Sequence, residues 1–554
     1  MPQHARKPDI LFFLLLSLLA LVPLRSLLWM GDWWTQDQQS YAVRAAELAQ
    51  CIRAGEWLGR WCADLDTGYG YPLFHYYAPG FYHLAAIMIL AGVAVMPAIK
   101  LALALMQLLG TFGMYQLARL FYERKAAFVC ALLWALLPYQ QVNLFIRGAL
   151  SELAALQWLV LALFLTIKNI KTPSTRSFVA AALASGSMIF THAITALIGT
   201  PLILAFAAAF AWHERRSFAA ILRAALPVFW GVALSCLYWL SALGETNFVR
   251  PGDLLQGNLS WRDHFLYIPQ LFNVTYWGFG PSIPGPRDGM ALHLGLAPLI
   301  FLGLAWWQKT KNRQPAEWPL LAGTIAAGVM VFFTLGISRP LWQTLPLMQF
   351  IQFPWRFLGE AGVAMCLAAG EGIGMMARTH RAFVLCILLI VLSPPWYLYP
   401  TKQVPPIVSS HPNSSELKSR AWKITAGDEY LPRDVQEKWP RAFPPQEIKI
   451  ISGSGSIRQI GEQRFYISAQ SPMTLIYGQY WFPNIDITAN DKSIRSHPSS
   501  PNGLIQFQVN PGKCKIAITR GHTPLQRVGD WLSGVAMLLL SLFAILRNRM
   551  QFIK

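Results

Sequence analysis

The sequence predicts an α-helical polytopic membrane protein, with about twelve transmembrane helices and a small all-β domain near its C-terminus. Three observations lead to this fold class. Of the 554 residues, 54% are hydrophobic and only 13% are charged, against about 25% charged in ordinary soluble domains. Apolar segments close to the length that crosses about 30 Å of hydrocarbon recur along most of the chain. Residues 400–527 instead contain short alternating segments separated by turn residues.

The net charge of +19 does not indicate a nucleic-acid partner. The Lys and Arg residues form no stripe and stand at the ends of apolar segments, which is the positive-inside pattern of membrane proteins. The sequence has no P-loop, no GxGxxG motif between a strand and a helix, no HExxH and no GxSxG. An enzyme of this kind would take an activated donor from the membrane rather than a soluble nucleotide.

Thirteen segments are apolar enough to be considered as spans. They are 10–30, 80–97, 98–118, 126–143, 149–167, 177–192, 194–212, 222–243, 291–308, 317–337, 357–376, 382–399 and 528–546. Both chain ends are basic, so we expect an even number of crossings. Treating 80–97 as a surface helix places the basic clusters 122–125, 168–171, 213–216, 309–313 and 377–381 on the side of the termini. We therefore predict twelve spans and cytoplasmic termini.

The N-terminal segment 10–30 follows Arg6 and Lys7 and lacks a small-x-small cleavage site, so it is interpreted as an uncleaved first span. Residues 31–97 form a long first external loop, with surface helices at about 38–54 and 80–97. Further external segments are 144–152, a turn near 192, and the loops 244–290 and 338–356. Residues 400–527 are external, and 528–554 form the last span and a cytoplasmic tail.

Asp37 lies at the N-terminus of the expected helix 38–54, which ends at Gly55. It acts either as an N-cap or as a partly buried general base at the membrane surface. Asp32 is a weaker candidate for the base, because it adjoins the first span directly. In the same loop, Cys51 and Cys62 would be able to form a disulfide in an oxidising compartment.

The turn IRGALSELAAL (146–156) places Arg147 and Glu152 at the external ends of two spans. Ionisable groups so close to hydrocarbon are functional candidates. Glu152 is either a second acidic group facing Asp37 or the local partner of Arg147, whose guanidinium would otherwise hold a phosphate.

Two further sites lie at external ends of spans. His192 is either a packing residue or a phosphate or sugar contact. Arg356, in FPWRFLGE (353–360), either binds a phosphate or pairs with Glu360 at i,i+4.

The stretch ADLDTGYGYPLFHYYAPGFYH (63–83) combines turn residues with aromatic ones. Tyr69, His75 and Tyr77 belong to an aromatic belt, which either anchors the loop at the membrane interface or forms a wall of the substrate site opposite Asp37.

Residues 400–527 predict a small β-sandwich that follows a Pro/Ser-rich linker at 400–420. The expected strands are 448–453, 464–469, 474–482, 504–509 and 515–520.

Several motifs together resemble those of the bacterial membrane proteins catalogued as 6-pyruvoyl-tetrahydropterin-synthase-related. These motifs are Asp37, GEWLGRW (55–61), GYGYPLFHYYAP (68–79), RGALSE, THAITAL and QFPWRFL (352–358). The C-terminal stretches 480–493 and 502–533 look like the terminal domain of those and of YfhO-like membrane proteins. The layout is similar to that of the GT-C glycosyltransferases, which include aminoarabinose transferases, protein mannosyltransferases and oligosaccharyltransferases.

This resemblance implies a seven-span GT-C-like module over 1–243, with further spans over 244–399. Asp37 takes the acidic position of the first loop and Glu152 that of the second. The chain departs from its relatives at Ser40-Tyr41, because they often carry a histidine a few residues after the aspartate.

The expected function is a glycosyltransferase that moves a sugar from a polyprenyl-phosphate donor to an acceptor hydroxyl on the extracytoplasmic face of the bacterial inner membrane. The acceptor is a glycan, a lipid or a protein. Asp37 and Glu152 are the expected catalytic residues, and Arg60, Tyr69, His75, Tyr77, Arg147, His192 and Arg356 the expected binding residues. No metal site is predicted and no cofactor is required, although a divalent cation remains compatible. The alternatives are a flippase of lipid-linked saccharides and a non-catalytic scaffold for envelope polysaccharide assembly.

Overall fold

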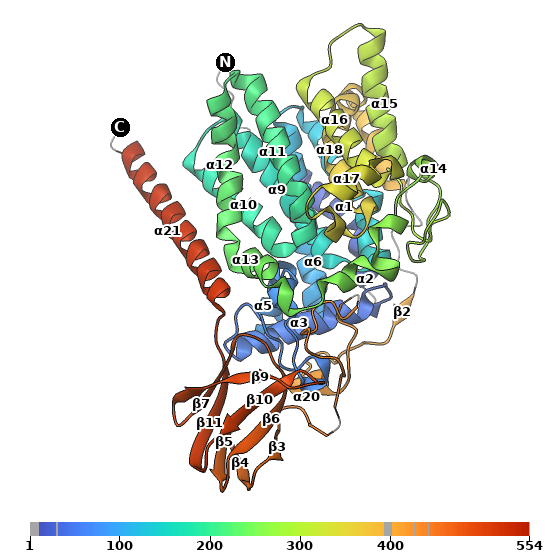
Figure 1. The fold of residues 1–554 in the computed structure, drawn as a ribbon. Helices are drawn as coiled ribbons and strands as arrows, with labels where there is room; N and C mark the ends of the chain where they lie inside the picture. Colours follow the sequence, from blue (N-terminus) through green and yellow to red (C-terminus); the bar gives the residue numbers. More distant parts are fainter. Residues whose placement is uncertain are drawn as a thin grey trace.

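The fold is that of a computed structural model, described over residues 10–28, 32–392, 402–425, 427–440, 442–461 and 463–552. A bundle of helices makes up most of the molecule, and a β-sandwich lies beyond one end of it (Figure 1). The last helix runs back from the sandwich alongside the bundle, and both chain ends lie at the end of the molecule away from the sandwich (Figure 1).

The N-terminal part forms helices of the bundle and the helices of the first loop between them. Its helices are α1 (Ile10–Ala20), α2 (Arg25–Leu28), α3 (Gln38–Arg53), α4 (Leu73–Tyr76), α5 (Gly80–Leu90) and α6 (Val95–Arg119). The predicted surface segment 80–97 is too long, because α5 ends at Leu90 and residues 95–97 already belong to α6. At about 1.5 Å per residue, the 11 residues of α5 extend about 16 Å, roughly half of the hydrocarbon thickness.

The central helices form the core of the bundle. They are α7 (Arg124–Ala135), α8 (Pro138–Val142), the π-helical turn η3 (Asn143–Arg147), α9 (Leu150–Lys171), α10 (Thr175–Thr191), α11 (Ala193–Arg215), α12 (Phe218–Leu234) and α13 (Cys236–Gly244). A loop region with the short helix α14 (Ile268–Phe272) leads to α15 (Leu296–Lys311), α16 (Trp318–Thr334), α17 (Arg339–Thr344), α18 (Leu358–Met376) and α19 (His380–Leu392).

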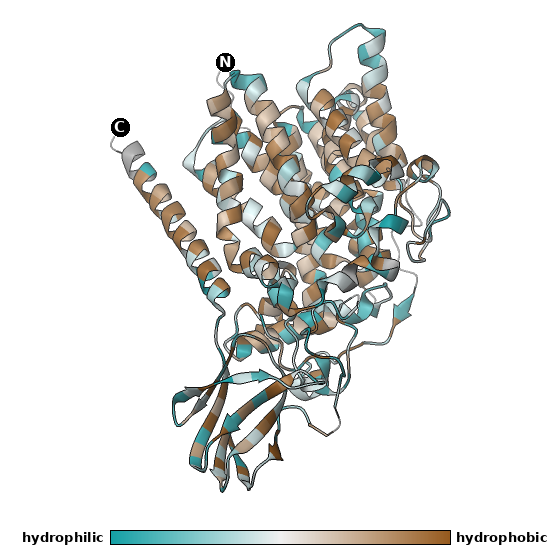
Figure 2. Ribbon diagram, in the orientation of Figure 1, coloured by the Kyte–Doolittle hydropathy of each residue, from teal (hydrophilic) through white to brown (hydrophobic). Residues whose placement is uncertain are grey.

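Within the described residues, six helical segments are long and apolar enough to cross a membrane, or eight if each of two bent pairs is one span. Three shorter apolar helices are Gly80–Leu90, Trp318–Thr334 and His380–Val391. Each of the thirteen predicted apolar segments contains a helix. Figure 2 shows that these helices are largely hydrophobic, whereas hydrophobic and hydrophilic residues alternate in the sandwich. The count of twelve spans stays a prediction.

The β-sandwich consists of two antiparallel sheets around one core. The first sheet has the order β3-β6-β10-β9 and the second β4-β5-β11-β7-β8. The strands are β3 (Ile448–Ser452), β4 (Gly455–Gly461), β5 (Arg464–Ala469), β6 (Met473–Tyr480), β7 (Ile485–Ala489), β8 (Lys492–Ile494), β9 (Ser496–Pro498), β10 (Leu504–Val509) and β11 (Gly512–Arg520). Side chains such as Leu475 and Phe507 of one sheet and Ile467 and Ile516 of the other share the core. The predicted sandwich and its five strands are confirmed, and four strands are added.

The described part of the predicted linker 400–420 is packed against the first loop. Its strand β2 (Gln403–Val404) pairs with β1 (Asp32–Trp33), and its helix α20 (Ser414–Lys418) contacts α3. Asp32 is buried in this junction, where one of its carboxylate oxygens accepts the Ile407 N–H at 3.1 Å. The interpretation as a simple linker was therefore wrong, because backbone pairing ties the segment to the loop. The last helix, α21 (Pro524–Phe552), follows the sandwich.

Candidate active site

A cavity of about 630 Å³ lies at the sandwich end of the bundle. It brings together six of the nine predicted site residues: Asp37, Tyr77, Arg147, Glu152, His192 and Arg356. These residues come from the first loop, the η3–α9 turn, the α10–α11 junction and the 3₁₀ turn just before α18. Their convergence depends on the packing of elements that lie far apart in the sequence, from Asp37 to Arg356.

Backbone pairing brings Asp37 to the η3–α9 turn. The Asp37 N–H donates to the Arg147 carbonyl at 2.9 Å, and the Gln36 N–H donates to the Ile146 carbonyl at 2.9 Å. Gly148 makes this approach feasible, because its φ is +74° and a Cβ there would lie 2.3 Å from Thr35 Oγ1. The close approach of the two segments therefore explains the glycine in the RGALSE motif.

Asp37 occupies the N-cap position of α3, but its carboxylate makes no capping hydrogen bond. The side chain is exposed, so the expected partial burial was wrong. A carboxylate that is exposed, lines a cavity and has no capping function is available to an incoming hydroxyl group. A second, smaller cavity of about 210 Å³ also includes Asp37 and is lined by polar residues, among them Gln36, Gln39, Lys423 and Thr425.

Glu152 lies in the first turn of α9 between two arginines. Its Oε1 is 2.9 Å from Arg147 Nη1, and its Oε2 is 3.2 Å from Arg356 Nε. The Tyr139 hydroxyl donates to Oε1 at 2.5 Å. The local Arg147–Glu152 pair therefore exists, whereas the proposed Arg356–Glu360 pair was wrong, because Arg356 reaches across to α9 instead. The ion pairs fix both guanidinium groups in place.

Both arginines have donors left for a ligand. The guanidinium of Arg147 lies over the Trp355 ring, 4.5 Å from its centroid, and Arg356 Nη1 donates to the Ile351 carbonyl at 2.6 Å. Among the described residues, no hydrogen-bond partner is seen for Nη2 of Arg147 or of Arg356. Both residues line the cavity, so these donors are suited to an anionic oxygen.

His192 caps the N-terminus of α11. Its Nδ1 accepts the Thr195 backbone N–H at 3.2 Å. Because Nδ1 is the acceptor, a neutral His192 carries its proton on Nε2, which gives the cavity a neutral hydrogen-bond donor.

The cavity residues that were not expected from the sequence include Arg44 on α3, and Glu429 and Tyr430 from the segment before the sandwich. Arg44 Nε donates to the Ile424 carbonyl at 2.8 Å, and its guanidinium lies 4.2 Å from the Tyr77 ring centroid. Arg44 follows Asp37 by seven residues, two helical turns, which is the one sequence signal that would have placed it on the same face.

The charged residues of the cavity are three arginines and three carboxyl groups: Arg44, Arg147 and Arg356, and Asp37, Glu152 and Glu429. Burial raises the pKa of Glu429. Because Arg147 and Arg356 keep donors that Glu152 does not use, they are suited to a monoanionic group such as a phosphodiester. The remaining wall is apolar, with Ile189, Ile194, Leu197, Val232, Trp239 and Leu243.

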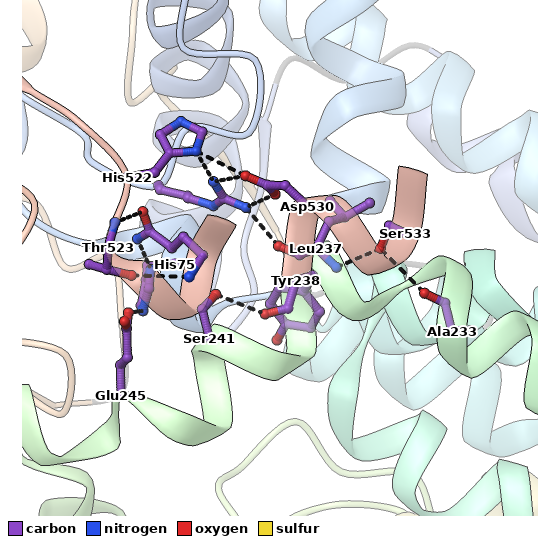
Figure 3. Close-up of polar contacts among 12 residues, drawn as sticks. His75, Ala233, Leu237, Tyr238, Ser241, Glu245, His522, Thr523, Asp530 and Ser533 are labelled. Carbon is purple, nitrogen blue, oxygen red and sulfur yellow. Dashed lines mark hydrogen bonds and ion pairs between the residues drawn. The ribbon is translucent and has the colours of Figure 1, made fainter. Parts of the chain in front are cut away.

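The other three predicted binding residues lie outside this cavity. Tyr69 donates to the carbonyls of Pro440 and Phe443. Figure 3 shows the polar network at the junction of α13 and α21, in which His75 Nε2 is 3.0 Å from Glu245 Oε2. Arg60 forms an ion pair with Asp530 and donates to the Leu237 carbonyl at 2.8 Å. All three hold the first loop against other elements.

One cluster in the described residues has the composition of a metal site. The ligand atoms of Glu47, Cys51 and Cys62 lie within 4.8 Å of one another, and all three residues are buried. Cys51 and Cys62 are free thiols with their sulfurs 3.9 Å apart, so the structure contains no disulfide between them. None of the three residues lines the cavity with Asp37.

Comparison with known proteins identifies the family of this chain. A family model described as a 6-pyruvoyl-tetrahydropterin synthase related domain, membrane protein, matches residues 74–397, more than half of the chain. The chain belongs to this family of membrane proteins. The resemblance seen in its motifs is thereby confirmed.

Among solved structures, two crystal structures of the Archaeoglobus fulgidus oligosaccharyltransferase are similar to the family member described here. The complex with Zn and sulfate has 18% sequence identity and a TM-score of 0.43, over 70% of this chain and 52% of that chain. The apo form has 15% identity and a TM-score of 0.45, over 71% and 55% of the two chains. This chain spans about half the length of that enzyme. A search of curated proteins gives no match.

Proposed function

We propose that the protein is an inverting glycosyltransferase that uses a polyprenyl-phosphate-linked sugar. The observation that carries this proposal is the 630 Å³ cavity, in which three arginines and the carboxylate of Asp37 meet an apolar wall. A lipid-linked sugar likewise combines an apolar tail, an anionic phosphate and a polar sugar.

In the proposed reaction, the phosphate lies between Arg147 and Arg356, and Nε2 of His192 donates a further hydrogen bond. Asp37 accepts the proton of the acceptor hydroxyl while its oxygen attacks the anomeric carbon. The bond between that carbon and the phosphate oxygen breaks, and the lipid phosphate leaves with the electron pair. The arginines stabilise the charge on the leaving phosphate, and a single displacement inverts the anomeric carbon.

The smaller cavity supports an acceptor approach from the other side of Asp37. Its amide and hydroxyl side chains, including Gln36, Gln38, Gln39 and Thr425, match the hydrogen-bonding groups of a glycan. Asp37 is shared by the two cavities. This arrangement favours an enzyme over a flippase, because a flippase needs no carboxylate between two substrate cavities.

We place the cavity on the extracytoplasmic face of a bacterial inner membrane, with both termini cytoplasmic and twelve spans. Contacts among the basic clusters support this orientation. Lys125 Nζ donates to the Arg378 carbonyl at 3.4 Å, and Lys171 Nζ donates to the Leu120 carbonyl at 2.6 Å. These clusters therefore gather at one end of the bundle, opposite the cavity, as the positive-inside rule requires of a cytoplasmic end.

Mass spectrometry of lipid-linked and surface glycans, in cells with and without the protein, tests the proposal. We expect a glycan that depends on the protein and is lost with Asp37→Asn, because removal of a general base costs about 10²- to 10⁴-fold in rate. Glu56→Gln, in the same loop but outside both cavities, is the control. Identical glycans with and without the protein would refute a transferase, and full activity of Asp37→Asn would refute the catalytic assignment.

A further inference from the structure

A separate cavity of about 730 Å³ lies at the other end of the bundle. Its lining comes from the α9–α10 and α11–α12 connections, from α10 and α12, and from the C-terminal part of α21. Figure 1 shows α21 diverging from the bundle toward its C-terminal end. The cavity is the space between this helix and the bundle.

The polar part of this cavity is cationic. Arg215, Arg223 and Arg547 line it, and none of its lining residues is acidic. All three arginines are exposed. Among the described residues, none of the three has a carboxylate within salt-bridge distance. Three cations around one cavity repel one another, so an anion in it would lower their free energy.

The other part of the cavity is aromatic and apolar. The Phe178 ring lies 5.3 Å from that of Phe543 and 6.3 Å from that of Trp230. Trp230 Nε1 donates to the Ala536 carbonyl at 3.1 Å, which holds α12 against α21. Leu540, which also lines the cavity, packs with Leu234 in one buried cluster.

We propose that this cavity binds one anionic phospholipid, with its phosphate between Arg215, Arg223 and Arg547 and an acyl chain against Phe178, Trp230 and Phe543. A free phosphate ion would use the arginines but would leave the aromatic wall exposed to water. A phospholipid satisfies both parts, because its charge and its hydrocarbon are adjacent at the membrane surface. The proposal does not depend on the glycosyltransferase reaction, since none of these residues lines the cavity with Asp37.

Native mass spectrometry of the purified full-length protein tests this site. The probes are phosphatidylglycerol, phosphatidylcholine and inorganic phosphate. The variant is Arg215→Gln with Arg223→Gln, and the matched control is Arg176→Gln with Arg216→Gln. The control removes the same charge from the same end of the molecule but from residues that do not line the cavity.

We expect the wild type to prefer phosphatidylglycerol over phosphatidylcholine. Each lining arginine should account for about tenfold in phosphatidylglycerol affinity, or about 1.4 kcal/mol, because a guanidinium forms charge-assisted hydrogen bonds with a phosphate. The control pair should change the affinity by less than about threefold, because exposed charges without contact contribute little.

Three results would overturn the proposal. The first is equal binding of the two lipids to the wild type, which needs no variant. The second is an equal loss of affinity in the variant and in the control. The third is displacement of phosphatidylglycerol by millimolar inorganic phosphate, which would indicate a site for a free anion.

Discussion

Arginines line a cavity at each end of the helical bundle, but only those at the Asp37 end have carboxylate partners. At the Asp37 end, Arg147 and Arg356 are held by the two oxygens of Glu152. At the other end, Arg215, Arg223 and Arg547 are exposed and lack carboxylate partners among the described residues. Arginines held by ion pairs are suited to position a leaving group for a reaction, whereas exposed arginines without carboxylate partners are suited to bind an anionic headgroup.

Gly148→Ala should cause the largest loss of glycan transfer, because it separates Asp37 from Arg147. The new methyl group would lie 2.3 Å from Thr35 Oγ1, so the Asp37 segment must move away from the Arg147 turn. A displacement of about 1 Å costs on the order of 10²-fold in rate. We expect that loss in glycan transfer, with binding of polyprenyl phosphate retained.

The control for this variant is Gly55→Ala. Gly55 also has a positive φ, +91°, but a Cβ there meets nothing within 4 Å. It therefore reproduces the backbone strain without the clash. Equal transfer rates in Gly148→Ala and Gly55→Ala would show that the close approach of the Asp37 segment to the Arg147 turn does not contribute to glycan transfer.

Arg356→Gln should weaken phosphate binding at the Asp37 end. The guanidinium reaches Glu152 and lines the cavity, and hydrogen bonds to charged groups are worth about 1.5–3 kcal/mol, so we expect about tenfold to hundredfold weaker binding of polyprenyl phosphate. Binding measured by native mass spectrometry, with Arg339→Gln as an exposed control, tests this. Unchanged affinity would remove Arg356 from the phosphate site.

Arg60→Gln should reduce stability rather than substrate binding. Arg60 is buried and joins the first loop to Asp530 of α21, so its loss should lower the free energy of unfolding by about 1.5–3 kcal/mol. Thermal melting in detergent measures the effect, with the exposed Arg53→Gln as the control. If melting is unchanged while polyprenyl phosphate binding is lost, Arg60 belongs to the substrate site after all.

Glu47→Gln should have the smallest effect, which depends on pH. Burial, and secondarily the charge of Asp64, raise the pKa of Glu47 above its ordinary value of 4.5. The folded state therefore holds this proton more tightly than the unfolded chain, and the contribution of Glu47 to stability falls as the pH rises above about 4.5.

Glutamine does not ionise at this position. The melting temperature of the wild type minus that of Glu47→Gln should therefore be higher at pH 5 than at pH 8. A difference that stays constant between these two pH values would contradict the assignment of a raised pKa.

Local patterns in the sequence predicted much of this fold. The lengths of the apolar segments and the positions of the turn residues located the helices and the five main strands. Both patterns can be recognised within a window of about 20 residues, the length of one membrane span. For Arg147 and Arg356, the sequence left open whether each forms an ion pair with a nearby glutamate or binds a phosphate. Arg147 pairs within its own turn, which spacing suggested, whereas Arg356 bypasses Glu360 for Glu152.

The remaining part of the site depends on contacts between distant segments. Glu429 and Tyr430 enter the cavity because the segment before the sandwich folds back onto α3, and no local pattern encodes that contact. Tyr69 and Tyr77 belong to the same aromatic stretch, yet Tyr69 donates to the carbonyls of Pro440 and Phe443 and Tyr77 lines the cavity. Aromatic composition alone does not distinguish these two positions.

In the proposed reaction, Asp37 acts on a lipid-linked saccharide that Arg147 and Arg356 hold. The amount of lipid-linked saccharide that co-purifies with Asp37→Asn, compared with the wild type and measured by mass spectrometry, tests this role. A protein that binds its donor but cannot consume it should carry more of it, so we expect a higher bound fraction in Asp37→Asn. An equal or lower fraction in that variant would refute the role of Asp37 as the base.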